Sequence, residues 1–319
     1  MAVNANRPER WKADIAHSVD FYNDWFLRFA PQTYRDSRMQ STVSVEEAFA
    51  LTSDLANIGA DILRLHPSLL PILRMATAPP LARDRLIGLA GVSTGLVRSL
   101  EIEKRLPSRM AAGRVDAELG RIVDVIARLL DIDIFPWLKT DRTPSTEEGY
   151  RAATVVADRL CGAISDPLIR NAQEQRQLAA LRQWLENRGY SLASGNLSDF
   201  AEMQLGTFAF RLNVPIRQAG REQTVNLPID VVIQPKNAGI GQLPLLIEAK
   251  SAGDFTNTNK RRKEEATKIA QLRHTLGSDI RFVLFLCGYF DSGYLGYEAA
   301  EGIDWVWEHR IDDLIEFGV

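Results

Sequence analysis

Four segments with the composition of β-strands lie close together in the second half of the chain, and they limit the possible folds more than any other feature. The segments are residues 207–216, 225–233, 243–251 and 280–290. In the first, apolar and polar residues alternate, which predicts a strand with one buried face. The fourth is apolar on both faces, as a central strand is. Residues 258–276 have the pattern of a helix, so the order of elements predicts an α/β core with a mixed sheet flanked by helices.

The first half of the chain has the periodicity of helices. Between about residues 10 and 164, apolar residues recur at three- and four-residue spacing. Ser44 with Glu47 forms a capping box, which predicts that a helix begins there. Asp166 followed by Pro167 predicts the start of a later helix, and Gly189 predicts its end. We therefore expect a helical domain over residues 1–165 and the α/β core over residues 166–319, an α+β organisation overall.

Composition excludes several classes of protein. With 45% hydrophobic and 25% charged residues, the chain has the balance of a globular protein rather than of a disordered one. The first residues contain no apolar segment of the kind found in signal peptides. The sequence also contains no run of 18 apolar residues, the length needed to span a membrane. Cys161 and Cys287 lie in apolar stretches, so we expect buried thiols in a reducing cytoplasm. Motifs of zinc peptidases and of P-loop ATPases are absent.

Three charged side chains in the predicted strands favour a metal-dependent hydrolytic site. Asp230 lies at the start of one strand, and the two-residue period of a strand places Glu248 and Lys250 on one face of the next. If the two strands pair, Asp230 and Glu248 could bind Mg²⁺ through their oxygens. The metal would activate water, and Lys250 would position or deprotonate that water. The alternative for Glu248 and Lys250 is a partly exposed ion pair on an edge strand.

A basic segment follows the third strand. Residues 250–273 carry seven basic and three acidic side chains, a local charge of +4 in a chain whose net charge is −3. Short polar and basic residues at a helix start can read base edges and hold phosphates. We expect DNA contacts from Asn257, Thr258, Asn259, Lys260, Arg261 and Arg262. A helix cap followed by a solvated first turn is the alternative explanation for the same residues.

The order of these motifs resembles the PD-(D/E)XK nuclease superfamily. The motif Pro228-Ile229-Asp230 precedes Glu248-Ala249-Lys250 in the chain. Residues 248–273, EAKSAGDFTNTNKRRKEEATKIAQLR, and residues 10–38, RWKADIAHSVDFYNDWFLRFAPQTYRDSR, resemble more particularly the XamI-type type II restriction endonucleases. The resemblance implies a PD-(D/E)XK core in which Asp230, Glu248 and the backbone carbonyl of Ala249 bind the metal and Lys250 is catalytic.

The same resemblance draws attention to three further residues. Members of the superfamily often have an additional acid on a helix that faces the sheet, and Glu174 shares a face with Leu178, Leu181 and Leu185. Glu174 would then be a further metal ligand, although it could equally favour its helix only through the helix dipole. Lys268 and Gln271 share a polar face of the later helix, which is either solvated or turned toward the site.

The resemblance also implies a function and partners. It implies Mg²⁺-dependent hydrolysis of double-stranded DNA by a homodimer at a short palindrome, with GTCGAC as the expected sequence. The helical domain would embrace DNA and form the dimer, and a separately encoded methyltransferase would protect the host. Two alternatives remain open at this point. One is a repair or recombination nuclease without sequence specificity, and the other is a non-catalytic DNA-binding protein on a nuclease-like fold.

Overall fold

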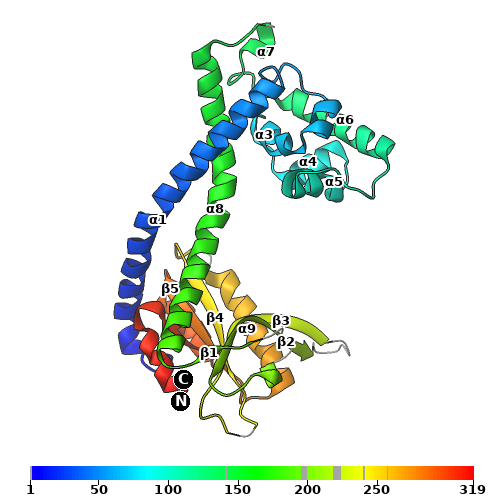
Figure 1. Cartoon of the computed structure of the whole chain (residues 1–319). Helices are drawn as coiled ribbons and strands as arrows, with labels where there is room; N and C mark the ends of the chain where they lie inside the picture. The colour runs from blue at the N-terminus through cyan, green and yellow to red at the C-terminus, as the bar shows by residue number, and fades with distance from the viewer. Residues whose placement is uncertain (1, 141, 195–199, 218–223, 240, 257) are drawn as a thin grey trace. The chain divides into compact units, whose positions relative to one another are not determined.

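The computed structural model of the chain contains two compact units (Figure 1). It describes residues 2–140, 142–194, 200–217, 224–239, 241–256 and 258–319, with the backbone alone for residues 258–261. One unit combines Met1–Phe29 with Arg170–Val319, and the other is Ala30–Ile169. The division thus falls within two long helices, α1 (Pro8–Leu51) and α8 (Thr146–Asn187). The roles expected for residues 1–165 and 166–319 remain predictions.

The unit formed by residues 30–169 is helical. Besides its parts of α1 and α8, it contains α2 (Ala60–Leu65), η1 (Pro67–Leu69), α3 (Leu70–Met75), α4 (Arg83–Ala90), α5 (Thr94–Arg98), η2 (Ser99–Glu103), α6 (Ala112–Leu129) and α7 (Trp137–Thr140). Helix α6 shows why these segments fold: Val115, Leu119, Ile122 and Ile126 repeat at helical spacing and are all buried. They belong to a hydrophobic core that also includes Phe135 and Trp137.

Two helix starts predicted from the sequence are wrong. Ser44 lies inside α1, where its hydroxyl donates a hydrogen bond to the Gln40 carbonyl at 3.2 Å instead of capping a helix. Pro167 lies inside α8. A proline removes the hydrogen bond to the carbonyl four residues earlier, that of Ala163, and both residues are exposed, so water can reach that carbonyl. Gly189 follows the end of α8 with φ +72°, as predicted.

The other unit contains a six-stranded mixed sheet, which confirms the predicted class of fold. Its strands are β1 (Ser191–Leu192), β2 (Thr207–Arg217), β3 (Thr224–Gln234), β4 (Leu245–Ala252), β5 (Arg281–Gly288) and β6 (Asp304–Trp307), in sequence order across the sheet. The pairs β2–β3 and β3–β4 are antiparallel, whereas β1–β2, β4–β5 and β5–β6 are parallel. The parallel pairs β4–β5 and β5–β6 are connected by α9 (Thr258–Leu276) and α10 (Ser292–Ala300).

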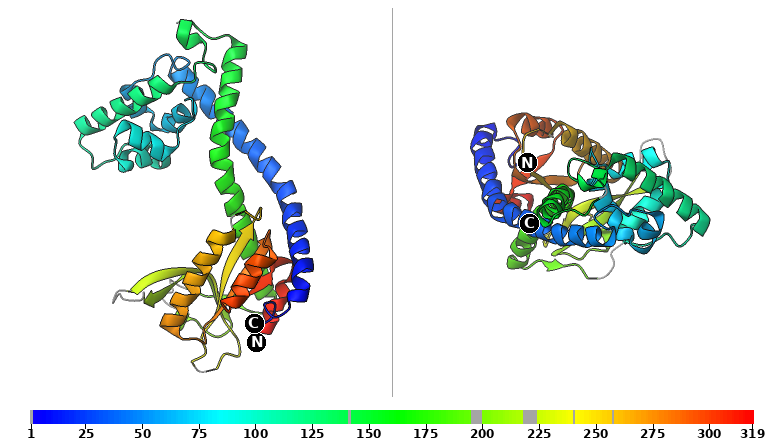
Figure 2. Two further views of the ribbon diagram at one scale, coloured as in Figure 1. Left: turned by 180° about the vertical axis from the view of Figure 1, so that it is seen from behind. Right: turned by 90° about the horizontal axis from the view of Figure 1, so that it is seen from above.

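Helices cover both faces of this sheet, and β4 lies between them. Figure 2 shows α9 and α10 together on one face, and Leu246 of β4 packs there with Ile269 and Leu272. On the other face, Leu245 and Ile247 pack with the α8 side chains Leu178, Leu181 and Leu185 and with Leu314 of η4 (Glu308–Phe317). The remaining short helix, η3, spans Phe200–Glu202. The predicted alternation of side chains along β4 is therefore confirmed.

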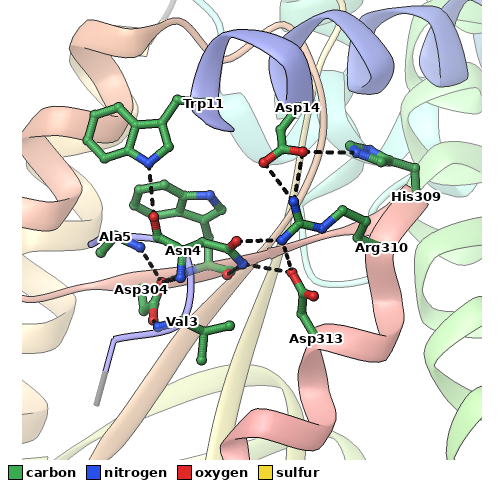
Figure 3. A network of polar contacts seen from close by, with 10 residues as sticks. Val3, Asn4, Ala5, Trp11, Asp14, Asp304, His309, Arg310 and Asp313 are labelled. Carbon is green, nitrogen blue, oxygen red and sulfur yellow. Dashed lines mark hydrogen bonds and ion pairs between the residues drawn. The ribbon is translucent and has the colours of Figure 1, made fainter. Parts of the chain in front are cut away.

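A network of polar contacts joins the first residues of the chain to the last strand (Figure 3). The carboxylate of Asp304, at the start of β6, accepts hydrogen bonds from the amides of Val3, Asn4 and Ala5. Arg310 contacts both oxygens of Asp14 at 2.8 Å and also bonds Asn4 Oδ1 at 2.7 Å. Because these groups are largely buried, the contacts are shielded from water and hold residues 3–14 against the sheet unit.

None of the helices in the described part of the chain combines the length and apolar character needed to span a bilayer.

Candidate active site

The site begins where β3 and β4 separate. The two strands pair from Val231 to Ile233 with Leu245 to Ile247, and continuing this register by one residue places Asp230 opposite Glu248. Asp230 Oδ2 accepts a hydrogen bond from the Ala249 amide at 2.9 Å. A side-chain oxygen thus takes the place that a backbone carbonyl has in a continuous ladder. This contact brings the two predicted acids together.

Two lysines bind the carboxylate of Glu248. Lys250 Nζ lies 3.0 Å from Glu248 Oε1, and Lys268 Nζ lies 2.5 Å from Glu248 Oε2. Lys268 also donates to the Pro228 carbonyl at 2.8 Å, so α9 is connected both to β3 and to β4. Glu248 is 7% exposed, and such a buried carboxylate requires these partners. The structure therefore brings together Asp230, Glu248, Lys250 and Lys268.

Burial and neighbouring charges shift the pKa values of this cluster. Burial, followed by the nearby Glu248 carboxylate, raises the pKa of Asp230 to about 6. Burial alone would lower the pKa of Lys250, but the carboxylates of Glu248 and Glu265 outweigh it and the net pKa is raised. Lys250 is therefore an ammonium ion at neutral pH. As an ammonium ion it can donate hydrogen bonds to water or to a phosphate oxygen.

The donor set suits a hard divalent cation. Asp230 and Glu248 offer carboxylate oxygens at adjacent positions, and a cation between them would offset their repulsion. Among the described residues, His, Cys, Asp and Glu form no group of three or more that could hold a metal ion. Mg²⁺ usually binds one or two carboxylates and retains several waters, so two acids and a backbone carbonyl are sufficient.

Glu174 contacts an arginine that the sequence analysis did not identify. Leu178, Leu181 and Leu185 are buried against the sheet, as expected for their face of α8, while Glu174 Oε1 lies 2.6 Å from Arg211 Nη2. Arg211 interrupts the β2–β3 ladder opposite Asp230 and has φ +52°, which is uncommon for a residue with a side chain. Its alternating position in β2 is typical of a solvated side chain, so the sequence offered no signal. A role for Glu174 as metal ligand remains a prediction.

The predicted DNA-binding residues are described only in part. Asn257 lies outside the described residues, and so do the side chains of Thr258, Asn259, Lys260 and Arg261. The guanidinium of Arg262 lies 5.0 Å from the ring centre of Tyr297, a cation–π contact. Gln271, expected near the site together with Lys268, lines a hollow of about 630 Å³ that also includes Arg217, Lys263 and His274.

A buried carboxylate that was not predicted from the sequence, Glu265, lies next to Lys250. Glu265 is 1% exposed, and its Oε1 lies 3.8 Å from Lys250 Nζ. Glu265 lies among charged residues, which made it look solvated, but it shares its helix face with Ile269 and Leu272. A carboxylate at this helical spacing from two apolar residues was the available signal.

Comparison with known proteins identifies the family. The family model of the XamI restriction endonuclease matches residues 53–307, well over half of the chain. The chain belongs to the XamI restriction endonuclease family. This XamI-family chain is also 53% identical over 313 residues to the type II restriction enzyme SalI of Streptomyces albus G, an alignment that covers 98% of each protein.

These matches make the chain a sequence-specific type II restriction endonuclease, a hydrolase that acts on DNA and belongs to a class that generally uses a divalent metal. They exclude the two alternative functions, a nuclease without sequence specificity and a non-catalytic DNA-binding protein. A crystal structure of protein VC1899 from Vibrio cholerae aligns with 90% of the XamI-family chain and 55% of its own length. With 14% identity and a TM-score of 0.29, that likeness carries no argument.

Proposed function

We propose that this XamI-family endonuclease cleaves double-stranded DNA with Mg²⁺ at the site formed by Asp230, Glu248 and Lys250. The observation that carries the proposal is the place of Asp230 next to Glu248 where β3 and β4 separate, with Lys250 on the same carboxylate. Two adjacent carboxylates and an ammonium ion are the groups that metal-assisted phosphodiester hydrolysis needs.

Each residue has a separate role in this proposal. Asp230, Glu248 and the Ala249 carbonyl hold Mg²⁺, which when bound supplies charge to the scissile phosphate and polarises water. Lys250 donates hydrogen bonds to the attacking water or to a phosphate oxygen. Lys268 orients Glu248 from α9, where its Nζ lies 2.5 Å from Glu248 Oε2. Glu174 is a further candidate ligand.

Partners follow from the same proposal. Residues 257–262 contact DNA, mostly at phosphates, because basic side chains there follow short hydrogen-bonding ones. A palindromic site has two equivalent strands, and each chain carries one set of Asp230, Glu248 and Lys250. A two-fold homodimer matches that symmetry, and the helical domain over residues 1–165 would form the interface and embrace DNA. A separate methyltransferase would protect the host.

We also propose a cytoplasmic location, which the two free, buried cysteines support.

The test uses two variants and two matched controls. Asp230→Asn and Glu248→Gln remove the charge of a proposed ligand with little change in shape, so cleavage of plasmid DNA should be abolished. Binding to a duplex containing GTCGAC, measured by fluorescence anisotropy without metal, should stay within about threefold because phosphate contacts remain. The controls are Asp279→Asn and Glu264→Gln, each of which removes an exposed carboxylate outside the proposed site.

The products distinguish the possible outcomes. Discrete fragments from the wild type and from both controls, together with uncut plasmid from the two site variants, support the proposal. Wild-type turnover in either site variant contradicts the assignment of that acid as a ligand. A smear of products from the wild type would contradict cleavage at a specific palindrome.

A further inference from the structure

Glu265 is a buried carboxylate next to Lys250 of the proposed site. It comes from the buried face of α9, and its Oε1 is 3.8 Å from Lys250 Nζ. In the structure, Lys250 has a closer partner in Glu248 Oε1 at 3.0 Å. Lys250 therefore lies between two carboxylates, one of which belongs to the proposed metal site.

These two carboxylates cannot be equivalent during the reaction. A divalent cation held by Glu248 would draw that carboxylate's electron density away from Lys250 and would repel the ammonium ion. Lys250 is three-quarters buried, with a side-chain exposure of 25%, so it needs a compensating negative charge. Glu265 is the other carboxylate within 4 Å of Lys250 Nζ among the described ion pairs.

Two residues of α10, Tyr294 and Glu298, lie next to Glu265. The Tyr294 hydroxyl donates a hydrogen bond to Glu265 Oε2 at 2.8 Å. Glu298, one helical turn after Tyr294, is fully buried, and its carboxyl oxygens have no hydrogen-bond donor among the described residues. Burial and the charge of Glu265 raise the pKa of Glu298 to about 8. Glu298 is thus neutral at pH 7, whereas Glu265 is paired with the Lys250 ammonium ion.

We propose that Glu265 is a positioning residue that keeps the Lys250 ammonium ion directed at the scissile phosphate while Glu248 is engaged by the metal. The proposal rests on the proposed function, because it needs Lys250 to act in cleavage. Glu265 itself contacts neither metal nor DNA in this scheme. It acts on the rate of cleavage through Lys250 alone.

The first test is Glu265→Gln, with its neighbour Glu264→Gln as the matched control on the exposed face of α9. Glutamine keeps the shape and can still accept the Tyr294 hydrogen bond, but it removes the charge. We expect the single-turnover cleavage rate at saturating enzyme to fall by about tenfold or more, the equivalent of at least about 1.4 kcal/mol. The dissociation constant for the duplex without metal should stay within about twofold, because Glu265 does not contact DNA. Glu265→Asp keeps the charge and should recover part of the rate.

Several outcomes overturn the inference. A wild-type rate in Glu265→Gln would overturn it, as would an equal loss of rate in Glu265→Asp. A parallel loss of DNA affinity would indicate a general structural role. If Glu265→Gln does not fold, as judged by circular dichroism, Tyr294→Phe replaces it. That change removes one hydrogen bond to Glu265 and should slow cleavage several-fold with unchanged affinity, and a wild-type rate would refute the inference.

Failure of the inference is distinguishable from failure of the proposed site. Inactive Asp230→Asn and Glu248→Gln variants together with a fully active Glu265→Gln variant would refute the role of Glu265 alone. An active Asp230→Asn or Glu248→Gln variant would instead refute the proposed active site.

Discussion

Glu298 makes the stability of the sheet unit depend on pH in a direction that is unusual for a carboxylic acid. Surface acids in ion pairs have lowered pKa values, so proteins that depend on them lose stability in acid. Glu298 has no exposed surface, and burial, followed by the charge of Glu265, raises its pKa from 4.5 to about 8. The folded protein therefore holds a proton at this position that the unfolded chain releases.

The size and sign of the effect follow from this difference. Between pH 4.5 and pH 8 the folded state binds more protons than the unfolded state, so the free energy of unfolding falls as the pH rises. The stabilising effect is complete below pH 4.5 and is lost as the pH passes through about 8. A difference of roughly 3.5 pKa units corresponds to about 5 kcal/mol, at 1.36 kcal/mol per unit.

The perturbation is Glu298→Gln. Glutamine resembles the protonated acid in shape and charge but does not titrate, so it removes this contribution to the pH dependence. We expect wild type and variant to have similar free energies of unfolding at pH 5. At pH 9 the variant should be the more stable, by an amount approaching about 5 kcal/mol. Glu301→Gln, an exposed acid just after α10, is the matched control and should follow the wild type.

Urea unfolding between pH 5 and pH 9, without added metal, measures the effect. Tryptophan fluorescence is a suitable probe because Trp305 and Trp307 of β6 are buried in the same unit as Glu298. Stability curves for wild type and Glu298→Gln that run parallel over the whole range would refute the reasoning. They would mean that Glu298 is ionised in the folded protein at neutral pH.

Three other predictions concern different parts of the molecule. Asp304→Ala removes the acceptor of three amides near the N-terminus and should cost about 1–3 kcal/mol in urea unfolding; an unchanged midpoint would contradict the role of that network. Lys260→Ala and Arg261→Ala should each reduce the salt dependence of DNA binding by roughly one unit of slope, and an unchanged slope would favour a solvated face. Light scattering should show a homodimer on a cognate duplex, and a DNA-bound monomer that accumulates nicked circles would contradict it.

The sheet unit could be predicted largely from local patterns. The four strand-like segments correspond to β2, β3, β4 and β5, and the predicted helix over residues 258–276 matches α9. Strand alternation depends on which face is buried, and that is visible over a few residues. The same alternation correctly placed Glu248 and Lys250 together, because neighbours two apart on a strand share a face.

The remaining features depend on contacts between distant parts of the chain. Ser44 and Pro167 carry strong local signals for a helix start, but each lies inside a long helix, because tertiary packing outweighs capping preferences. In the sequence Glu298 resembles the other acids of an acidic segment, and only the fold buries it next to Glu265. The bonds from Asp304 to residues 3–5 join positions about 300 apart, and no local pattern indicates such a pairing.

That last pairing has a consequence for the newly made chain. Protein synthesis adds about 5–20 residues per second, so Asp304 is added roughly 15–60 s after Asn4. Residues 30–169 form their own compact unit and are complete long before that time. The sheet unit instead needs both early and late residues, so the contacts of residues 3–5 with Asp304 cannot form until β6 has been translated. On the growing chain the proposed nuclease site is thus the last part to mature, after the helical unit has had time to fold.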